Sequence, residues 1–313
     1  MHRTVRILVG VFAWAFLATA SMAADQCPPA SGVALQVLGS GGPIADDGRA
    51  SSGYIVWVDG KSRVMIDAGA GTFLRFGEAR ARFEDIDFIG LSHFHTDHSA
   101  DFPALLKSGF FSGRERELTV AGPSGDGPFP GLVAYLDALL EPGRGAYAYL
   151  SGYRDGSAGL VQLVPKEVAD TGEPDFTSVY RDSATQLHVQ ALHVPHGIVP
   201  ALGFRVTVGD VVVAFSSDQN GSDPRFVELA RDADLLVMHL VIPEGATGIA
   251  TRLHARPSAI GQIAAESHAD RLVLSHLMAR SLRSLENNVA VVRESYDGPV
   301  LVAEDLDCYV VSD

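Results

Sequence analysis

Cysteine and basic residues are both scarce in this chain of 313 residues. It has two cysteines, Cys27 and Cys308, and 24 lysines and arginines against 38 aspartates and glutamates, giving a formal net charge of −14. Two cysteines are too few for a disulfide-rich scaffold. The sequence has no Lys/Arg-rich stripe, and a net negative surface repels a phosphate backbone. We therefore expect no long nucleic acid among its partners.

Long apolar runs are also scarce, and the one that stands out lies at the N-terminus. Arg3 and Arg6 precede the apolar residues 7–18, and Ser21 and Ala23 have the spacing that a signal peptidase recognises. This pattern predicts a signal peptide over residues 1–23 and a periplasmic or secreted mature protein without a stable membrane anchor. An uncleaved anchor is the alternative, although the run is short for a permanent membrane helix.

Export determines what the two cysteines can do. An oxidising compartment permits a disulfide between Cys27 and Cys308. Two unpaired thiols are an equal alternative, because the sequence does not give the Cα separation that a disulfide requires. Neither cysteine lies near the histidine-rich segments.

The mature chain alternates apolar strands with helical stretches, and no Pro/Gly-rich linker divides it. We expect a single α/β domain over residues 24–313, with two sheets packed face to face and helices outside. Residues 141–185, rich in Gly, Asp, Ser and Tyr, suggest an irregular insertion. Strands are expected at 34–38, 54–58, 63–66, 88–91, 118–121, 187–194, 203–208, 211–215, 235–238, 272–274, 300–303 and 308–311, and helices at 72–83, 102–110, 132–140, 225–230, 258–267 and 282–296.

The segment Ser92-His93-Phe94-His95-Thr96-Asp97-His98 carries the strongest chemical signal. It directly follows an apolar strand. Side chains two apart in an extended segment point the same way, so His93 and His95 can face one cation, and Asp97 and His98 a second point nearby. Three imidazoles and a carboxylate within six residues are typical ligands for zinc or a similar ion.

One such segment cannot supply the ligands of two metal ions, so further ligands must come from elsewhere. His196, Asp218 and His276 each stand at the end of an apolar strand. Polar residues at strand ends are where a site forms at the edge of a sheet. Each is weak evidence alone, and His193 competes with His196. Together with the first segment they complete a dinuclear set of ligands.

The order His-x-His-x-Asp-His, then His, Asp and His, resembles the metallo-β-lactamase superfamily, and within it the ribonuclease Z and arylsulfatase-like branch. The resemblance covers about residues 34–305. It rests also on Leu38-Gly39-Ser40-Gly41-Gly42-Pro43, Ile66-Asp67-Ala68-Gly69-Ala70-Gly71-Thr72, His196 to Phe204, His254, and Leu274 to Arg280.

This resemblance implies an αββα sandwich with two divalent metal ions at one edge: zinc first, with manganese or iron as alternatives. One ion is implied on His93, His95 and His196, the other on Asp97, His98 and His276, with Asp218 bridging them. A hydroxide shared by two such ions attacks an ester.

The candidate catalytic residues are Asp97 and His254. His254 matches the family's proton-donating histidine, and its alternative role is that of an ordinary residue at a helix start. Asp67 is expected to hold the ligand loop by hydrogen bonds. His239 falls where the ribonuclease branch looks to have an acidic residue, which puts the ribonuclease proton relay in doubt.

These features predict a metal-dependent hydrolase acting on a small-molecule ester, either a phosphodiester or an aryl sulfate. A second hypothesis is a lactonase, thioesterase or β-lactamase acting on a carbonyl group, which the same ions would polarise. A third is a non-catalytic metal-binding protein on the same scaffold, because a fold does not fix a function. The sequence is compatible with an oligomer.

Overall fold

The computed structural model describes residues 27–172 and 176–312. The signal peptide predicted over residues 1–23 lies outside the described residues and stays a prediction. Among the residues described, we find no helix with the length and apolar character needed to cross a membrane.

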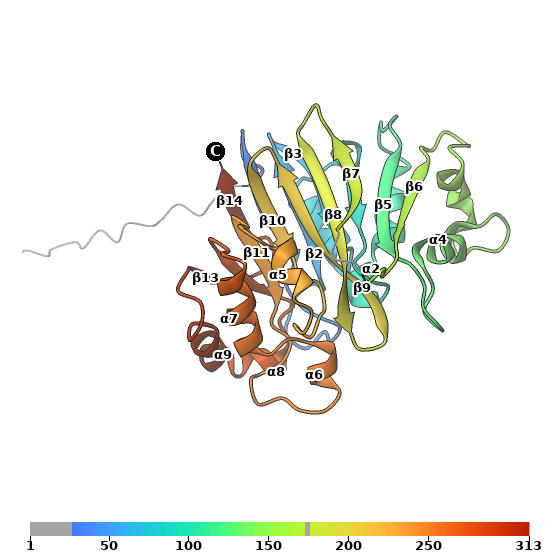
Figure 1. Cartoon of the computed structure of the whole chain (residues 1–313). Helices are drawn as coiled ribbons and strands as arrows, with labels where there is room; N and C mark the ends of the chain where they lie inside the picture. Colours follow the sequence, from blue (N-terminus) through green and yellow to red (C-terminus); the bar gives the residue numbers. More distant parts are fainter. Residues whose placement is uncertain (1–26, 173–175, 313) are drawn as a thin grey trace, which may run out of the picture.

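Two seven-stranded mixed sheets form the centre of the molecule (Figure 1). Each is assembled from one half of the chain, except that the last strand joins the first sheet. The first sheet has the order β14 (Cys308–Ser312), β1 (Val33–Gly39), β2 (Gly53–Val58), β3 (Lys61–Ile66), β4 (Phe88–Gly90), β5 (Leu118–Pro123) and β6 (Leu163–Val168). The second has the order β13 (Val300–Val302), β12 (Leu272–Ser275), β11 (Leu235–His239), β10 (Val211–Phe215), β9 (Val199–Val208), β8 (Leu187–His196) and β7 (Thr177–Asp182).

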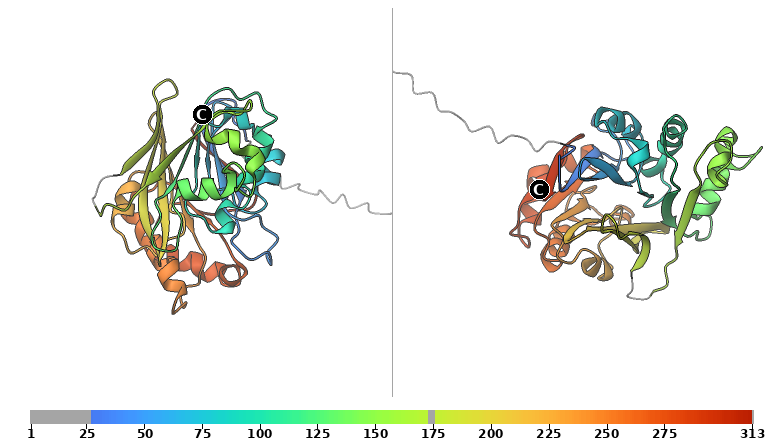
Figure 2. Two further views of the ribbon diagram at one scale, coloured as in Figure 1. Left: turned by 90° about the vertical axis from the view of Figure 1, so that its right-hand side faces the viewer. Right: turned by 90° about the horizontal axis from the view of Figure 1, so that it is seen from above.

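Helices cover the outer face of each sheet. One apolar cluster lies between the sheets and includes Val56 from the first and Phe204 from the second. A second cluster joins the first sheet to α1 (Thr72–Glu78), α3 (Phe102–Gly109) and α4 (Leu132–Leu140). A third joins the second sheet to α5 (Arg225–Leu229), α7 (Pro257–Glu266) and α9 (Leu285–Val292). The four layers are visible from above (Figure 2), and they confirm the expected αββα sandwich.

The expectation of an irregular insertion over residues 141–185 is wrong. This stretch contains the 3₁₀ helix η2 (Ala148–Arg154) and the strands β6 and β7, each at the edge of a sheet. Edge strands tolerate proline and charged residues because one side has no strand partner. β6 accordingly carries Pro165 and Lys166, so its composition hid it.

Two predicted helices are shorter than expected. The helix expected at 72–83 ends at Glu78, and Arg80 then adopts a left-handed φ of 57°. The helix expected at 282–296 is shortened to α9, and a separate short helix, α8 (Ala279–Leu282), precedes it. The remaining short helical segments are η1 (Phe83–Asp85), α2 (Thr96–Ser99) and α6 (Ala250–Leu253).

Strand direction determines where the functional side chains meet. Strands β10, β11, β12 and β13 are parallel, and β8 runs the same way because β9 is antiparallel to both β8 and β10. Strands β3 to β6 are likewise parallel to one another. The carboxyl ends of parallel strands meet at one edge of a sheet, so residues that follow them are brought together.

Cys27 and Cys308 form a disulfide, with their Cα atoms 5.7 Å apart. Of the two alternatives left by the sequence, the structure therefore has the bonded one. The bond ties the start of the described chain to β14 at the edge of the first sheet.

Candidate metal centre

The loop after β4 and the helix α2 that follows it carry four potential ligands, and Asp67 holds this segment. Asp67 follows β3 and is 1% exposed. Its carboxylate accepts hydrogen bonds from the backbone N–H of Ser92 (2.7 Å) and the Ser92 hydroxyl (2.9 Å), and it lies 2.7 Å from Nδ1 of His98. In the neutral ring, a proton on Nδ1 leaves the free lone pair of His98 on Nε2. Asp67 thus fixes the loop and the tautomer of one ligand, as expected.

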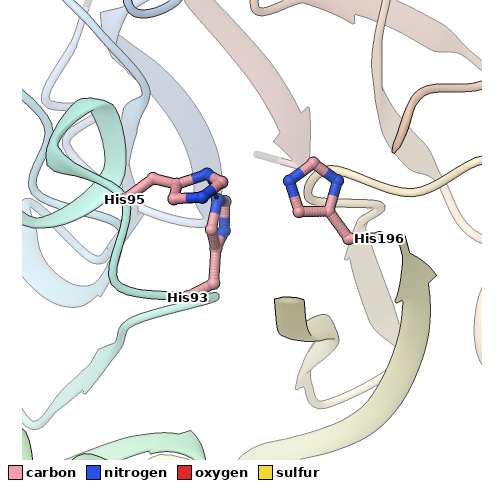
Figure 3. Close-up of side chains that lie close together, drawn as sticks. All are labelled: His93, His95 and His196. Carbon is pink, nitrogen blue, oxygen red and sulfur yellow. Dashed lines mark hydrogen bonds between the residues drawn. The ribbon is translucent and has the colours of Figure 1, made fainter. Parts of the chain in front are cut away.

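His93, His95 and His196 form the first group of donors. Their ligand atoms lie within 4.8 Å of one another, and Nε2 of His93 is 3.0 Å from Nδ1 of His95. Figure 3 shows the three rings facing a common point, with His196 approaching from the second sheet. Nδ1 of His196 donates to the carbonyl oxygen of Leu253 (2.8 Å).

Asp97, His98 and His276 form the second group of donors, and they too lie within 4.8 Å of one another. Nε2 of His98 is 3.1 Å from Nε2 of His276, which is 3.2 Å from Oδ2 of Asp97. All three residues are buried. This group brings the first loop against the end of β12.

Asp218 lies between the two groups. Its Oδ2 is 3.7 Å from Nε2 of both His98 and His196, and its Oδ1 is 3.5 Å from Nε2 of His276. The side chain is 2% exposed and follows the carboxyl end of β10. The structure therefore brings all seven predicted ligands into two adjoining groups. That they bind metal stays a prediction.

Buried charge gives this arrangement its chemistry. Burial opposes ionisation of Asp218, but His276, His239 and His98 hold its pKa well below its usual range. Burial also opposes a charge on His98, yet Asp67 and Asp218 raise its pKa well above the ordinary value. For His93, burial and the neighbouring His98 instead lower the pKa well below that of a free imidazole. The ionised carboxylates therefore favour a positive charge among these buried side chains.

A divalent cation fits these residues. Nε2 of His196 is buried and, among the described residues, has no hydrogen-bond partner. Because its Nδ1 already donates to Leu253, this nitrogen is a lone pair aimed into the donor cluster. A buried acceptor without a donor is costly, and a cation removes that cost. Imidazole and carboxylate donors suit zinc, manganese or iron.

Three residues that follow strands near the site have a left-handed backbone. Asp67, Ser217 and His276 have φ angles of 60°, 53° and 53°. Such conformations are uncommon outside glycine and cluster at functional sites. Close approach also requires glycine at position 42, where a Cβ would lie 2.7 Å from Cε1 of His276. This explains part of the Ser40-Gly41-Gly42 segment noted in the sequence.

His254 lies beside the donor groups, and His193 does not. Nδ1 of His254 is 3.7 Å from Oδ2 of Asp218, and it has no hydrogen-bond partner among the described residues. Burial lowers the pKa of His254 to about 3, so the ring is neutral in the free protein at neutral pH. Nε2 of His193 donates a hydrogen bond to the carbonyl oxygen of Val168 (2.8 Å). None of the donor groups in the described chain includes His193. The structure therefore places His196, and not His193, among the candidate donors.

A cavity of about 510 Å³ opens onto the site. Its walls are mostly apolar and include Phe94, Leu253 and Met278. The Arg280 guanidinium also lines it, with Nε donating to the carbonyl oxygen of Val241 (2.9 Å). Sequence reasoning gave no role to Arg280, although it is the one Lys or Arg residue in the Leu274–Arg280 segment, and that charge was the available signal.

Two further residues that reach the donor cluster are Tyr54 and Ser275. Tyr54 lies in β2 and is 1% exposed, and its hydroxyl is 2.8 Å from Oγ of Ser275 and 3.2 Å from Nε2 of His239. The sequence could not predict this contact, because Tyr54 lies in an apolar strand and its two partners come from the other half of the chain.

The layers and the paired donor groups define an αββα protein with a candidate dinuclear centre. A family model described as "Beta-lactamase superfamily domain" matches residues 62–277, more than half of the chain. The chain belongs to the metallo-β-lactamase superfamily and is a hydrolase of that superfamily.

Proteins with similar sequences include ribonucleases. Ribonuclease Z from Thermobifida fusca is 26% identical over 296 residues, covering 87% of this chain and 92% of that protein. The short form of human tRNase Z has a similar structure, with a TM-score of 0.69 and 20% identity over 90% of this chain and 100% of that one. The metallo-β-lactamase fold protein YhfI from Bacillus subtilis has a TM-score of 0.65 and 21% identity, covering 88% and 98%. The two structures support the fold alone.

These relatives correct one expectation. The exclusion of long nucleic acids, and with it the restriction to a small-molecule ester, is wrong, because relatives that match most of the chain are ribonucleases acting on RNA. The error came from using the net charge of −14 as evidence about the site. A bound cation is often the largest local charge in a site, so the overall balance does not fix the local field.

Proposed function

We propose that this chain hydrolyses phosphodiester bonds at a dinuclear metal centre. The observation that carries the proposal is the convergence of seven donors from both sheets, six of them buried and His95 exposed, onto two adjoining points. Similarity to ribonuclease Z over 87% of the chain supports a phosphodiester over a carbonyl substrate. Zinc is the proposed ion, with manganese or iron as alternatives.

The two cations would be held by His93, His95 and His196 and by Asp97, His98 and His276, with Asp218 shared. When bound, such ions supply a nucleophile at neutral pH and neutralise charge on the attacked group. Other residues of the chain hold the ligand side chains in position. Asp67 holds the His98 ring, and the Leu253 carbonyl oxygen holds the His196 ring.

His254 is the proposed proton donor to the leaving oxygen. A neutral ring cannot act as an acid, and the pKa of about 3 argues against a resident proton in the free protein. An anionic phosphodiester beside the ring raises that pKa, because an opposite charge favours the protonated form. Substrate binding would thus favour uptake of a proton from solvent by His254, and Arg280 would face the same anion from the cavity wall.

A substrate panel tests this function. The protein, loaded with Zn²⁺ and then with Mn²⁺, is assayed on a tRNA precursor, a chromogenic phosphodiester, an aryl sulfate, a lactone and a β-lactam. We expect metal-dependent turnover on at least one of the two phosphodiesters, and its loss in Asp218→Asn. Turnover confined to the carbonyl substrates contradicts the proposal, and so does turnover confined to the aryl sulfate.

We further propose that the protein is exported. The Arg3–Ala23 pattern and the Cys27–Cys308 disulfide both support an oxidising compartment. Mass spectrometry of the protein from its native host is expected to find a chain that starts at Ala24. Full-length protein in the cytoplasmic fraction contradicts export.

A further inference from the structure

We infer that Tyr54 and His239 are positioning residues, which together fix the carboxylate of Asp218 and do so across the two sheets. The inference rests on the proposed metal centre. Tyr54 comes from β2 of the first sheet and His239 from the end of β11 in the second. Neither belongs to the proposed set of metal ligands, although a ring nitrogen of His239 lies within 4.8 Å of donor atoms of Asp218 and His276.

The two oxygens of Asp218 have different surroundings. Oδ1 lies 2.8 Å from Nδ1 of His239, the shortest contact of this carboxylate. Oδ2 lies 3.7 Å from the ring nitrogens of His98, His196 and His254. A carboxylate held through one oxygen presents the other in a fixed direction, so His239 determines which way Oδ2 points.

The tautomer of His239 connects this contact to Tyr54. Nδ1 of His239 faces a carboxylate oxygen at 2.8 Å, and a carboxylate accepts hydrogen bonds. Nδ1 therefore carries the ring proton, and in this tautomer Nε2 is an acceptor. The Tyr54 hydroxyl, 3.2 Å from Nε2, is the donor that reaches it. Tyr54 therefore holds His239 in the tautomer that Asp218 needs.

The chain of hydrogen bonds continues to Ser275. The hydroxyls of Tyr54 and Ser275 are 2.8 Å apart, and either hydroxyl can donate. With the Tyr54 proton committed to His239, Ser275 donates to Tyr54. Ser275 is 0% exposed and directly precedes His276, so the network ends beside a proposed ligand of the second metal ion.

Burial means that the loss of one hydrogen-bond partner in this network is costly. Tyr54, His239 and Ser275 are 1%, 4% and 0% exposed, so water cannot replace a lost partner. Partners that orient metal ligands change metal affinity or activity by about 10–100-fold when removed. The same residues also link β2 to β11 and β12, so the spacing of the sheets and the direction of Asp218 depend on one another.

The test is Zn²⁺ affinity, measured by competition with a chromogenic chelator and without substrate. We expect Tyr54→Phe, which removes one oxygen, to weaken Zn²⁺ binding by roughly tenfold, and His239→Leu to weaken it by up to about 100-fold. His239→Gln, whose amide can donate to Asp218, should fall between His239→Leu and the wild type.

Tyr153→Phe is the matched control. Tyr153 is also 1% exposed, and its hydroxyl donates to a backbone carbonyl, that of Leu106 (2.8 Å), away from the donor groups. It should lower the melting temperature and leave Zn²⁺ affinity unchanged. Wild-type affinity in Tyr54→Phe, or an equal loss in Tyr153→Phe, overturns the positioning role alone. A wild-type protein that binds no Zn²⁺ overturns the proposed function as well.

Discussion

The two sheets supply the candidate centre in different ways. The first provides His93, His95, Asp97 and His98 from one segment of six residues after β4, which runs into α2. The second provides His196, Asp218 and His276 from the ends of three strands, β8, β10 and β12. The first set is positioned locally, by Asp67 beneath the loop. The second depends on strand register and on contacts such as that between His239 and Asp218.

The largest effect is expected where the two sets meet. Asp218→Asn keeps the shape of the side chain but removes the charge between the two donor groups. We expect the loss of at least one metal ion per chain, by elemental analysis, and an activity loss of at least about 10³-fold, since metal catalysis contributes several kcal/mol. A variant that keeps full metal content and activity would show that the second sheet does not complete the site.

A smaller effect, confined to turnover, is expected for His254. His254→Ala should retain both metal ions and reduce turnover by about 10²-fold or more on substrates with poor leaving groups, where proton donation matters most. Activated aryl leaving groups should be less affected. Loss of metal instead of turnover would make His254 a ligand, since it also stands within 4.8 Å of donor atoms of His196 and Asp218.

Asp67→Asn tests the local support of the first set. The amide loses the charge that holds the proton on Nδ1 of His98, so metal affinity should fall by about 10–100-fold, measured by chelator competition. Comparing the metal affinities of Asp67→Asn and His239→Leu shows how strongly the ligands of each sheet depend on their supporting residues. An unchanged affinity in Asp67→Asn would show that the first loop does not need its buried carboxylate.

The disulfide is predicted to affect stability and not the site. Replacing both Cys27 and Cys308 by serine removes a crosslink that spans 281 positions, which should cost about 2–5 kcal/mol of unfolding free energy. Denaturant unfolding measures that loss, and Zn²⁺ affinity of the folded variant should stay at the wild-type value. A change in affinity would mean that the edge strand β14 supports the centre.

The smallest effect is expected for His268, which lies outside the donor groups. It is exposed and pairs with Asp232 at 3.5 Å. Exposed pairs of this kind contribute little, so His268→Ala should change unfolding free energy by less than about 0.5 kcal/mol and leave metal content unaltered. A loss of metal there would show that histidine substitutions disturb the centre non-specifically.

The same contrast explains what the sequence could predict. The loop from His93 to His98 was predictable because its ligands are neighbours in the chain, and the buried central strands because they are apolar. Strands β6 and β7 were missed, since edge strands carry polar residues and proline. The left-handed backbone at Ser217 and His276, and the approach of Tyr54 to His239, arise from tertiary packing, which no local pattern records.

The most direct test of the account is the metal content of the mature wild-type protein, purified without chelators, loaded with Zn²⁺ and freed of excess metal. Elemental analysis should find two ions per chain, because donors from both sheets complete two adjoining groups. A protein that retains none, or one whose content is unchanged by Asp218→Asn, contradicts the convergence of the two sheets on a dinuclear centre.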